Sequence, residues 1–328
     1  MRTFSGIQPT GRKHLGNYLG AIRQYVAAQE RGDAIFCVVD LHALTMRYDP
    51  EELPAAVLDT TALLLAAGLD PERCVLFRQS DVKEHTELCW MLTTTTAYGE
   101  LNRMTQFKEK SEQQKDFISA GLFAYPILQA ADILAYRTDE VPVGEDQQQH
   151  IELARDIAQR FNSRFGETFV VPVHRIPEVA ARVMDLQVPT KKMSTTGGTE
   201  QGTVLILDGS DDVRRKFRSA VTDSGREVVR GRDKAGITNL IEILAAVRGV
   251  TPEEVEKSYA DANGYAAFKQ DVGEAVVELL APVQKRYAEL RPDEAGLAAT
   301  LAEGAGKARM IAAEVVGLAR ERMGLQAL

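Results

Sequence analysis

This sequence lacks the features that mark secreted, membrane-spanning or broadly nucleic-acid-binding proteins. Its three cysteines form no CxxC pair, so neither a disulfide framework nor a protein-held metal site is expected. No apolar run reaches the roughly 20 residues of a membrane helix, and no basic segment followed by an apolar core marks a signal peptide. The net charge of -8 argues against indiscriminate binding to nucleic acid. We therefore expect a cytoplasmic protein with no membrane and no DNA partner.

The composition is that of a soluble globular protein, with 45% hydrophobic and 26% charged residues over 328 positions. Such a length suggests roughly two domains of about 150 residues. Short apolar runs first alternate with helical patterns, and the expected strands are residues 3–7, 34–39, 74–77, 140–143 and 169–173. From residue 210 onward the patterns are mainly helical. The sequence thus predicts an α/β fold, a doubly wound parallel sheet of Rossmann type followed by an α-helical C-terminal domain.

The stretch from Phe4 to Gly20 is the first with chemical interest. An apolar, strand-like run leads through a turn into a helix, and Asn17 suits the N-cap of that helix. A helix N-terminus presents unpaired N–H groups and partial positive charge, which suit a phosphate. Gly16 has no side chain, so a flat ring could lie against the backbone there. An ordinary turn between a strand and a helix explains the same residues equally well.

Two later stretches also carry polar residues that need an explanation. Val188–Thr203 is rich in Gly, Ser and Thr and carries adjacent lysines, which predicts a flexible loop. Asp132 lies in a long apolar helical run, residues 118–136, where an ionised carboxylate is costly unless it has a partner. A solvent-facing aspartate is the alternative, and we favour a carboxylate that binds a ligand or a structural partner.

Together these stretches resemble the ATP-binding motifs of class I aminoacyl-tRNA synthetases. Residues 14–17, HLGN, are similar to the HIGH motif, and residues 192–196, KMSTT, are similar to KMSKS. Six segments resemble bacterial tryptophanyl-tRNA synthetases in the same order: FSGIQPTG, HLGNYLGA, MTQFKEKS, YPILQAADIL, VPVGEDQQQHIELARDIAQRFN and PTKKMS. The resemblance covers nearly the full length, and the combination is far more specific than any single motif.

The resemblance implies a two-step reaction on L-tryptophan, Mg-ATP and tRNA(Trp). The tryptophan carboxylate attacks the α-phosphate of ATP, with Mg²⁺ held through ATP, and the tRNA then takes tryptophan from the adenylate. A homodimer is implied as well. The expected division is a catalytic domain at residues 1–205 with the KMSKS-like loop at 190–202, an anticodon-binding domain at 206–302, and a C-terminal helix at 303–328 that packs back toward the catalytic domain.

Individual residues follow from the resemblance by position. The implied catalytic residues, near the leaving pyrophosphate, are Lys110, Lys192, Ser194 and Thr195. The implied ATP-binding residues are Gln8, Pro9, Thr10, His14, Gly16, Asn17, Gly144, Glu145, Asp146, Val183, Lys192, Met193, Ser194, Thr195 and Thr196. Asp132 would accept the indole N–H, and the other implied tryptophan-binding residues are Phe4, Gly6, Val39, His42, Tyr125, Gln129, Val141, Val143 and Gln147.

The chain departs from the family pattern at three of these positions. Thr195 stands where the family commonly has lysine, so the loop supplies one cation fewer to the pyrophosphate. We expect either compensation by Lys191, Lys192 or Lys110, or slower activation. Gln129 stands one helical turn before Asp132, where methionine is common, and could alter the indole pocket. His14 replaces a small hydroxyl residue and brings the motif closer to HIGH.

Alternatives to a tryptophan enzyme remain at this stage. A tyrosyl-tRNA synthetase shares the fold but needs a phenol-binding pair, which the sequence does not show. A small-molecule adenylyltransferase also uses a HIGH-like turn, and a tRNA-binding paralogue that has lost activation would explain Thr195. In the helical domain, a candidate basic face for RNA comprises Arg214, Arg215, Lys216, Arg218, Arg230 and Arg232, of which only a subset is expected to touch RNA.

Overall fold

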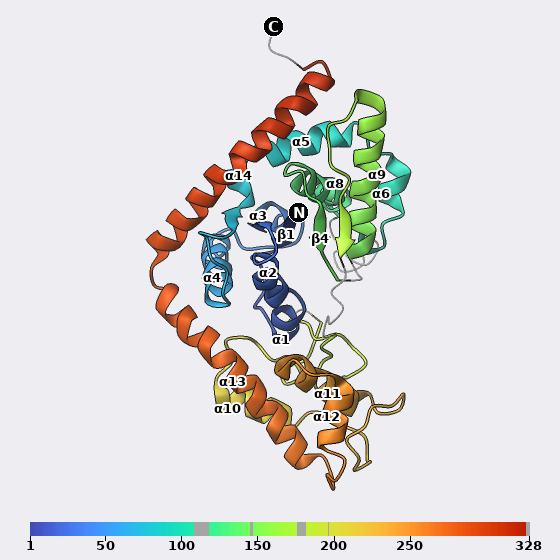
Figure 1. The fold of residues 1–328 in the computed structure, drawn as a ribbon, viewed down its shortest axis with the longest axis vertical. Coiled ribbons are helices and arrows are strands. Elements are labelled where there is room, and N and C mark those ends of the chain that lie inside the picture. The colour runs from blue at the N-terminus through green and yellow to red at the C-terminus, as the bar shows by residue number, and fades with distance from the viewer. Residues whose placement is uncertain (108–117, 145–146, 176–181, 196, 326–328) are drawn as a thin grey trace. The chain divides into compact units, whose positions relative to one another are not determined.

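The computed structural model describes residues 1–107, 118–144, 147–175, 182–195 and 197–325 (Figure 1). By its internal contacts the chain divides into two compact units. The first unit comprises Met1–Thr10, Tyr25–Pro177 and Asp293–Leu328, and the second comprises Gly11–Gln24 and Glu178–Pro292. The boundaries expected at residues 205 and 302 concern the function of each part and stay a prediction.

A five-stranded parallel sheet in the order β3-β2-β1-β4-β5 forms the centre of the first unit. Its strands are β1 (Arg2–Ile7), β2 (Asp33–Val38), β3 (Val75–Arg78), β4 (Glu140–Pro142) and β5 (Val173–Arg175). The predicted parallel α/β sheet is confirmed. The strand order reverses at β1, which pairs with β2 on one side and β4 on the other. Parallel sheets bind ligands at the carboxyl ends of the strands beside such a switch point.

The last strand begins later than the sequence predicts. Residues 169–172 are outside the sheet, because the N–H groups of Thr168 and Phe169 donate to Asn162 Oδ1 at 3.0 and 2.9 Å. The ring of Phe169 packs on Phe161, with ring centroids 4.7 Å apart. The apolar run that reads as a strand therefore fills the core instead of extending the sheet.

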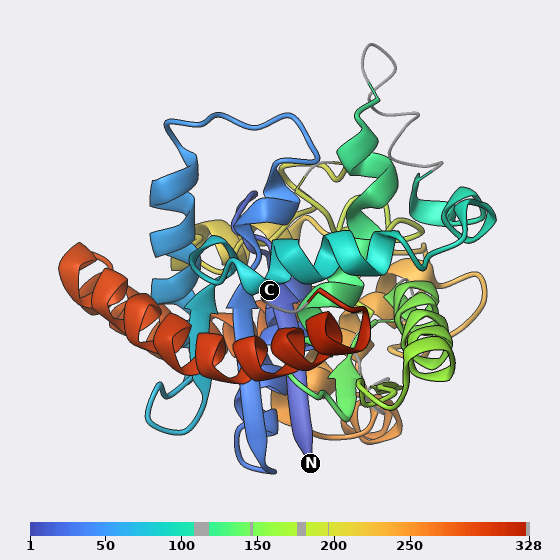
Figure 2. The ribbon, with the colours of Figure 1, turned by 90° about the horizontal axis from the view of Figure 1, so that it is seen from above.

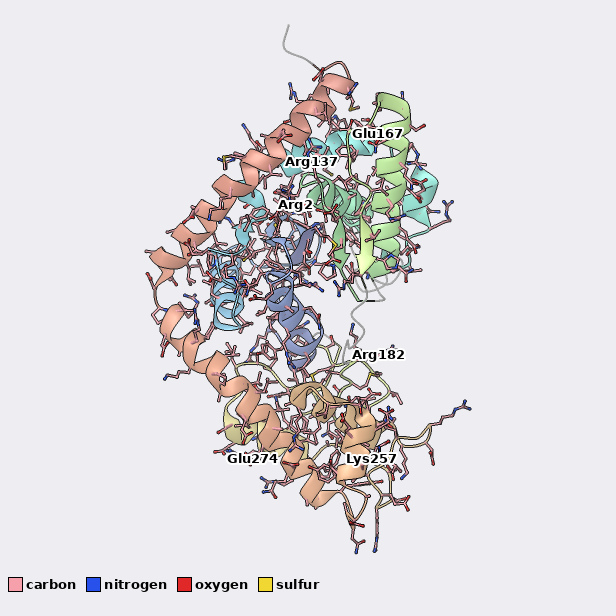
Figure 3. The ribbon with its side chains drawn as sticks, in the orientation of Figure 1. Arg2, Arg137, Glu167, Arg182, Lys257 and Glu274 are labelled. Carbon is pink, nitrogen blue, oxygen red and sulfur yellow. The ribbon has the colours of Figure 1, made fainter. Side chains whose placement is uncertain are left out.

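Helices pack around this sheet. They are α3 (Asp40–Ala43), α4 (Leu53–Ala66), α5 (Glu84–Thr93), α6 (Tyr98–Asn102), α8 (Ala120–Leu134), α9 (Gln148–Phe165), α14 (Glu294–Arg322) and the 3-10 turn η2 (Gln79–Asp81). α8 packs against both α5 and α9, whereas α14 crosses the sheet against β3, α4 and α5 (Figure 2). Gly304 permits this approach, since a Cβ there would lie 1.9 Å from the Leu76 carbonyl oxygen. Arg137, labelled in Figure 3, pairs with Glu314 of α14 at 2.9 Å.

The second unit is mainly helical, as expected for the chain after residue 210. Its elements are α1 (Leu15–Asn17), the π-helical turn η1 (Tyr18–Ile22), α10 (Ser210–Arg218), α11 (Ala235–Arg248), α12 (Pro252–Ser258) and α13 (Ala266–Leu290). The helix α2 (Arg23–Ala28) continues from η1 into the first unit. α13 packs on α10 and α11 around the buried rings of Phe217 and Phe268. Among the described residues, no helix is long and apolar enough to cross a membrane.

Candidate active site

Asp132 is the centre of a buried polar cluster in the first unit. It lies on α8 with only 1% of its surface exposed, so the alternative of a solvent-facing aspartate is wrong. Its Oδ1 accepts hydrogen bonds from His85 Nδ1 at 2.5 Å and from Gln79 Nε2 at 2.7 Å. Its Oδ2 accepts from His42 Nε2 at 2.8 Å and from the same Gln79 Nε2 at 2.8 Å. Both carboxylate oxygens are thus fully engaged by donors.

Two of these donors come from the carboxyl ends of neighbouring strands, and His85 comes from α5. His42 lies on α3 directly after β2, and Gln79 opens the η2 turn directly after β3. The amide of Gln79 is oriented, because its Oε1 accepts from the Leu41 N–H at 3.1 Å and its NH₂ group therefore faces Asp132. The sequence analysis did not identify Gln79 or His85. Gln79 directly follows β3, at the edge where parallel sheets bind ligands, and this position is a signal that could have found it, whereas His85 lies further along the chain on α5.

Electrostatics keep the Asp132 carboxyl ionised. Burial raises its pKa, but the hydrogen bonds and charge of His85 and His42 outweigh burial and lower the pKa to about 2. His85 Nε2 in turn lies 2.6 Å from the Tyr136 hydroxyl, whose pKa is raised above its ordinary value, chiefly by burial. Asp132 is therefore an acceptor only, and the Tyr136 hydroxyl keeps its proton.

The expected tryptophan-binding residues lie in the same unit as this cluster. Phe4, Val39, His42 and Val141 are all buried. Gly6 on β1 allows close packing, since a Cβ there would lie 2.9 Å from Val39 Cγ1. Tyr125 contacts the His42 ring edge-on at 6.2 Å between centroids, and its hydroxyl lies 2.9 Å from His150 Nε2. The remaining expected residues are only partly buried: Gln129, Val143 and Gln147.

The residues at the carboxyl ends of β1 and β4 also lie in the first unit. Gln8, Pro9 and Thr10 directly follow β1, and Gly144 follows β4, the neighbouring strand. Pro9 is buried, and its carbonyl accepts from Thr60 Oγ1 at 3.3 Å. Four expected site residues lie outside the described residues: Lys110, Glu145, Asp146 and Thr196.

The HIGH-like residues open the second unit, and one local expectation is wrong. His14, not Asn17, is the N-cap, and the helix begins at Leu15. Asn17 is the third helical residue, and its Oδ1 accepts from the His14 N–H at 3.0 Å, closing the first turn. Backbone hydrogen bonds fix this turn against the segment after the KMS loop, from Leu15 N to Val204 O at 2.8 Å and from Ile206 N to Lys13 O at 3.0 Å.

His14 is nearly buried and close to the loop lysine. Burial, followed by the charges of Lys192 and Lys13, lowers the pKa of His14 to about 4, so its imidazole is neutral at pH 7. Burial also lowers the pKa of Lys13 to about 8. A Cβ on Gly16 would lie 3.0 Å from the His14 ring and 3.5 Å from Val183 Cβ. The missing side chain at Gly16 therefore leaves room for the histidine ring and for the Val183 segment.

The KMSKS-like loop, residues 190–202, lies against the segment that contains Val183 and Met184. Met193 N donates to Val183 O at 3.0 Å, and Lys192 forms an antiparallel bridge with Met184. The Ser194 carbonyl accepts from Thr203 Oγ1 at 3.1 Å. Thr195 Oγ1 lies 3.6 Å from the Cβ position of Gly11. Among the described residues, the second unit therefore brings together eight expected ATP-binding residues: His14, Gly16, Asn17, Val183, Lys192, Met193, Ser194 and Thr195.

Asp185, which the sequence analysis missed, organises this loop. It is 1% exposed, and its carboxylate accepts from the N–H groups of Gln187, Val188 and Thr199 at 2.8, 3.0 and 2.9 Å. Burial raises the pKa of Asp185, but these hydrogen bonds outweigh burial and lower it overall. Gly202 and Gly198 are packed against the carboxylate, since Cβ atoms there would lie 1.8 and 3.0 Å from its oxygens. Only glycine fits at Gly202 while Asp185 stays in place.

The candidate basic face is largely neutralised by carboxylates. Lys216 is 5% exposed and contacts Asp208 Oδ2 at 2.6 Å, so it is not part of an exposed face. Arg214 bonds both oxygens of Glu274, labelled in Figure 3, at 2.8 and 2.9 Å. Arg230 is paired with two glutamates of α12. The candidates that are exposed are Arg215, Arg218 and Arg232.

Comparisons with known proteins agree over the whole chain. Residues 1–281 match the family described as tRNA synthetases class I (W and Y). Tryptophan–tRNA ligase 1 of Streptomyces coelicolor is 51% identical over 99% of this chain and 97% of its own length. Tryptophanyl-tRNA synthetase of Mycoplasma pneumoniae has a similar solved structure, with TM-score 0.91, 34% identity and coverage of 99% and 98% of the two chains. The Campylobacter jejuni enzyme, solved with ADP and tryptophan, gives TM-score 0.83, 36% identity and coverage of 99% and 100%.

Proposed function

Since the chain belongs to the bacterial tryptophanyl-tRNA synthetases of class I, we propose that the residues around Asp132 bind tryptophan and those around Lys192 bind ATP. Like its full-length relatives, the protein is a tryptophan–tRNA ligase, an ATP-dependent enzyme. A tyrosine enzyme and an unrelated adenylyltransferase are thereby set aside. The observation that carries the residue-level proposal is the buried, ionised Asp132 at the carboxyl edge of the sheet.

The substrates follow from this assignment. The tryptophan carboxylate attacks the α-phosphate of Mg-ATP, giving tryptophanyl-adenylate and pyrophosphate. The terminal ribose hydroxyl of tRNA(Trp) then attacks the adenylate. Phosphoryl chemistry of this kind depends on positioning and charge neutralisation, not on a protein nucleophile. The backbone amides and lysines of the second unit suit that task.

For the indole N–H to bind Asp132, one of the present donors must lose its hydrogen bond to the carboxylate. All acceptor positions of the carboxylate are taken, yet a single Gln79 Nε2 contacts both oxygens, at 2.7 and 2.8 Å. The indole N–H would take one oxygen while Gln79 keeps the other. A phenol or a plain phenyl ring has no N–H at that place and would leave the buried acceptor unpaired, which costs roughly 1–3 kcal/mol or more.

ATP recognition would use the loop and the HIGH-like turn together. Lys192, Ser194 and Thr195 would face the pyrophosphate, and the backbone of Val183 and Met193 would meet the adenine. The neutral imidazole of His14 adds no positive charge, so neutralisation of the leaving pyrophosphate would depend on lysines. The other proposed ATP contacts are Gln8, Pro9, Thr10, Gly16, Asn17, Gly144, Glu145 and Asp146, with Lys110 and Thr196.

Adding a cation at residue 195 is expected to accelerate activation. Thr195→Lys should raise kcat for tryptophan-dependent ATP–pyrophosphate exchange about 5- to 10-fold, because an extra charge would stabilise the leaving pyrophosphate. Thr195→Gln, which adds length without charge, is the matched control. Equal rates for wild type, Thr195→Lys and Thr195→Gln would show that other lysines already supply the charge.

The hydrogen bonds of Asp185 to the loop give a prediction for ATP binding. Gly202→Ala should raise the KM for ATP about 10-fold and lower stability by about 1–3 kcal/mol, because the new Cβ would overlap the Asp185 carboxylate. Gly197→Ala is the control, since a Cβ there meets nothing within 4 Å. Pyrophosphate exchange and thermal melting measure both effects. Identical behaviour of the two variants would mean that Asp185 does not hold the loop.

We further propose a cytoplasmic homodimer. Trp90 on α5 and Tyr98 on α6 are 70% and 73% exposed, and the Tyr98 ring lies 5.4 Å from that of Phe123 on α8. Exposed aromatic side chains such as these are typical of surfaces that bind another protein chain. In the helical unit Arg215 is exposed but pairs with Asp212 at 2.7 Å, so Arg218 and Arg232 are the better candidates for contact with tRNA(Trp).

Amino-acid-dependent ATP–pyrophosphate exchange, with tryptophan and tyrosine side by side, tests the proposed function. Exchange with tryptophan alone is expected. Exchange with neither amino acid would favour the tRNA-binding paralogue, and exchange with tyrosine would contradict the role of Asp132.

A further inference from the structure

A line of two side chains, His85 and Tyr136, runs away from the Asp132 carboxylate into the core. His85 Nδ1 lies 2.5 Å from Asp132 Oδ1, and His85 Nε2 lies 2.6 Å from the Tyr136 hydroxyl. His85 and Tyr136 are both 0% exposed. No substrate could touch either group without unpacking the core. Whatever they contribute to the reaction must therefore pass through a neighbouring residue, and Asp132 is the one to which His85 is hydrogen-bonded.

Aromatic rings hold this line in place. The Tyr136 ring stacks on Phe4 at 5.5 Å, with 9° between the ring planes. Phe77 lies 5.8 Å from the Tyr136 ring and 5.7 Å from the His85 ring. Phe4 is itself an expected wall of the indole pocket. The packing thus leaves the His85 ring little freedom to turn.

The carboxylate at one end of the line requires a proton on His85 Nδ1. The ionised Asp132 can only accept, so His85 Nδ1 must donate to it. The Tyr136 hydroxyl keeps its proton and can donate to His85 Nε2. A proton on His85 Nδ1 satisfies the carboxylate, and Nε2 lies within hydrogen-bond distance of the Tyr136 hydroxyl. With the proton on Nε2 instead, the Nδ1 lone pair would face a carboxylate oxygen.

We propose that His85 and Tyr136 are positioning residues for tryptophan, which hold Oδ1 of Asp132 from the core side. This arrangement leaves Oδ2, with His42 and the shared Gln79, as the place where the indole N–H binds. The proposal rests on the proposed role of Asp132 as indole acceptor. His85 and Tyr136 are fully buried, and in this proposal they act on specificity through the carboxylate.

The test compares tryptophan with 3-(benzothien-3-yl)alanine, in which sulfur replaces the indole N–H. Dissociation constants for both ligands are measured on the full-length protein, for wild type, His85→Leu, His85→Asn and Tyr136→Phe. The His85→Leu change removes the donor, and we expect the preference for tryptophan over the sulfur analogue to fall about 10- to 30-fold. Asparagine places an amide N–H near the position of Nδ1, so His85→Asn should retain the preference within about threefold.

A purely structural role gives a different pattern. Loss of packing at His85 would weaken both ligands equally and leave their ratio unchanged, which would overturn the proposal. Should His85→Leu fail to fold, Tyr136→Phe decides, since it keeps the stacked ring and removes only the hydroxyl. It should lower the ratio about 3- to 5-fold, as loss of a single hydrogen bond predicts, and an unchanged ratio contradicts the proposal.

The variant Asp132→Asn separates the proposed positioning role of His85 and Tyr136 from the proposed role of Asp132 as indole acceptor. When that variant loses the preference for tryptophan but His85→Leu and Tyr136→Phe keep it, the positioning role fails and indole recognition by Asp132 stands. When Asp132→Asn keeps the preference, the proposed role of Asp132 itself has failed.

Discussion

Asp132→Asn is expected to lower kcat/KM for tryptophan in pyrophosphate exchange by about 100-fold or more. The charged acceptor for the indole N–H is lost, and a site built to bind a polar group discriminates strongly once that bond cannot form. The new amide would also place an NH₂ group against donors from His85 or Gln79, so a stability loss of about 1–3 kcal/mol is expected. Rates are therefore measured well below the melting temperature of the variant.

The control for Asp132→Asn is Asp156→Asn on α9, the same chemical change at an exposed aspartate. It should leave kcat/KM for tryptophan unchanged. The KM for ATP should be similar in all three proteins, because Asp132 belongs to the tryptophan residues. A loss for Asp132→Asn that appears only as a higher ATP KM would count against indole recognition.

Lys192→Ala is the second change with a large expected effect. It should reduce kcat for pyrophosphate exchange about 100- to 1000-fold, the usual effect of removing one group that stabilises transition-state charge. The KM for tryptophan should change little, since Lys192 acts on the pyrophosphate end of ATP. Its place in the bridge to Met184, beside the neutral His14, supports this role.

Lys191→Ala is the matched control, one residue earlier in the same loop. It removes the same charge, and we expect an effect of less than about 5-fold on kcat. Comparable losses in the two variants would mean that the loop acts through its total charge and not through a positioned Lys192. A large loss in Lys191→Ala alone would reverse the assignment.

Sequence reasoning found the parts of the fold that local chemistry dictates. Continuous apolar runs identified β2 and β3, because strands buried on both faces need them. Asp132 stood out because a carboxylate among Ala, Ile and Leu is costly without a partner. The wrong N-cap at Asn17 also has a local cause, since asparagine is the better capping residue. Long-range backbone bonds to residues 204 and 206 instead fix the turn at His14.

The parts that sequence reasoning missed depend on contacts between distant residues. His85 and Gln79 lie 47 and 53 positions from Asp132, and only the place of Gln79 at the end of β3 sets either apart from an ordinary polar residue. Asp185 similarly reaches across 14 positions to Thr199. The sequence around Phe169 predicts a strand, but its ring packs into the core. The N–H groups of Thr168 and Phe169 donate to Asn162 Oδ1 and not to a neighbouring strand. Burial in three dimensions, not periodicity, decides each case.

The measurement that bears most directly on indole recognition is pyrophosphate exchange by the wild-type enzyme with tryptophan and with 3-(benzothien-3-yl)alanine. The two amino acids have nearly the same shape and differ in the N–H that Asp132 would bind. We expect kcat/KM for tryptophan to exceed that for the sulfur analogue by about 100-fold or more. Equal values for the two would contradict the assignment of Asp132 as the residue that recognises tryptophan.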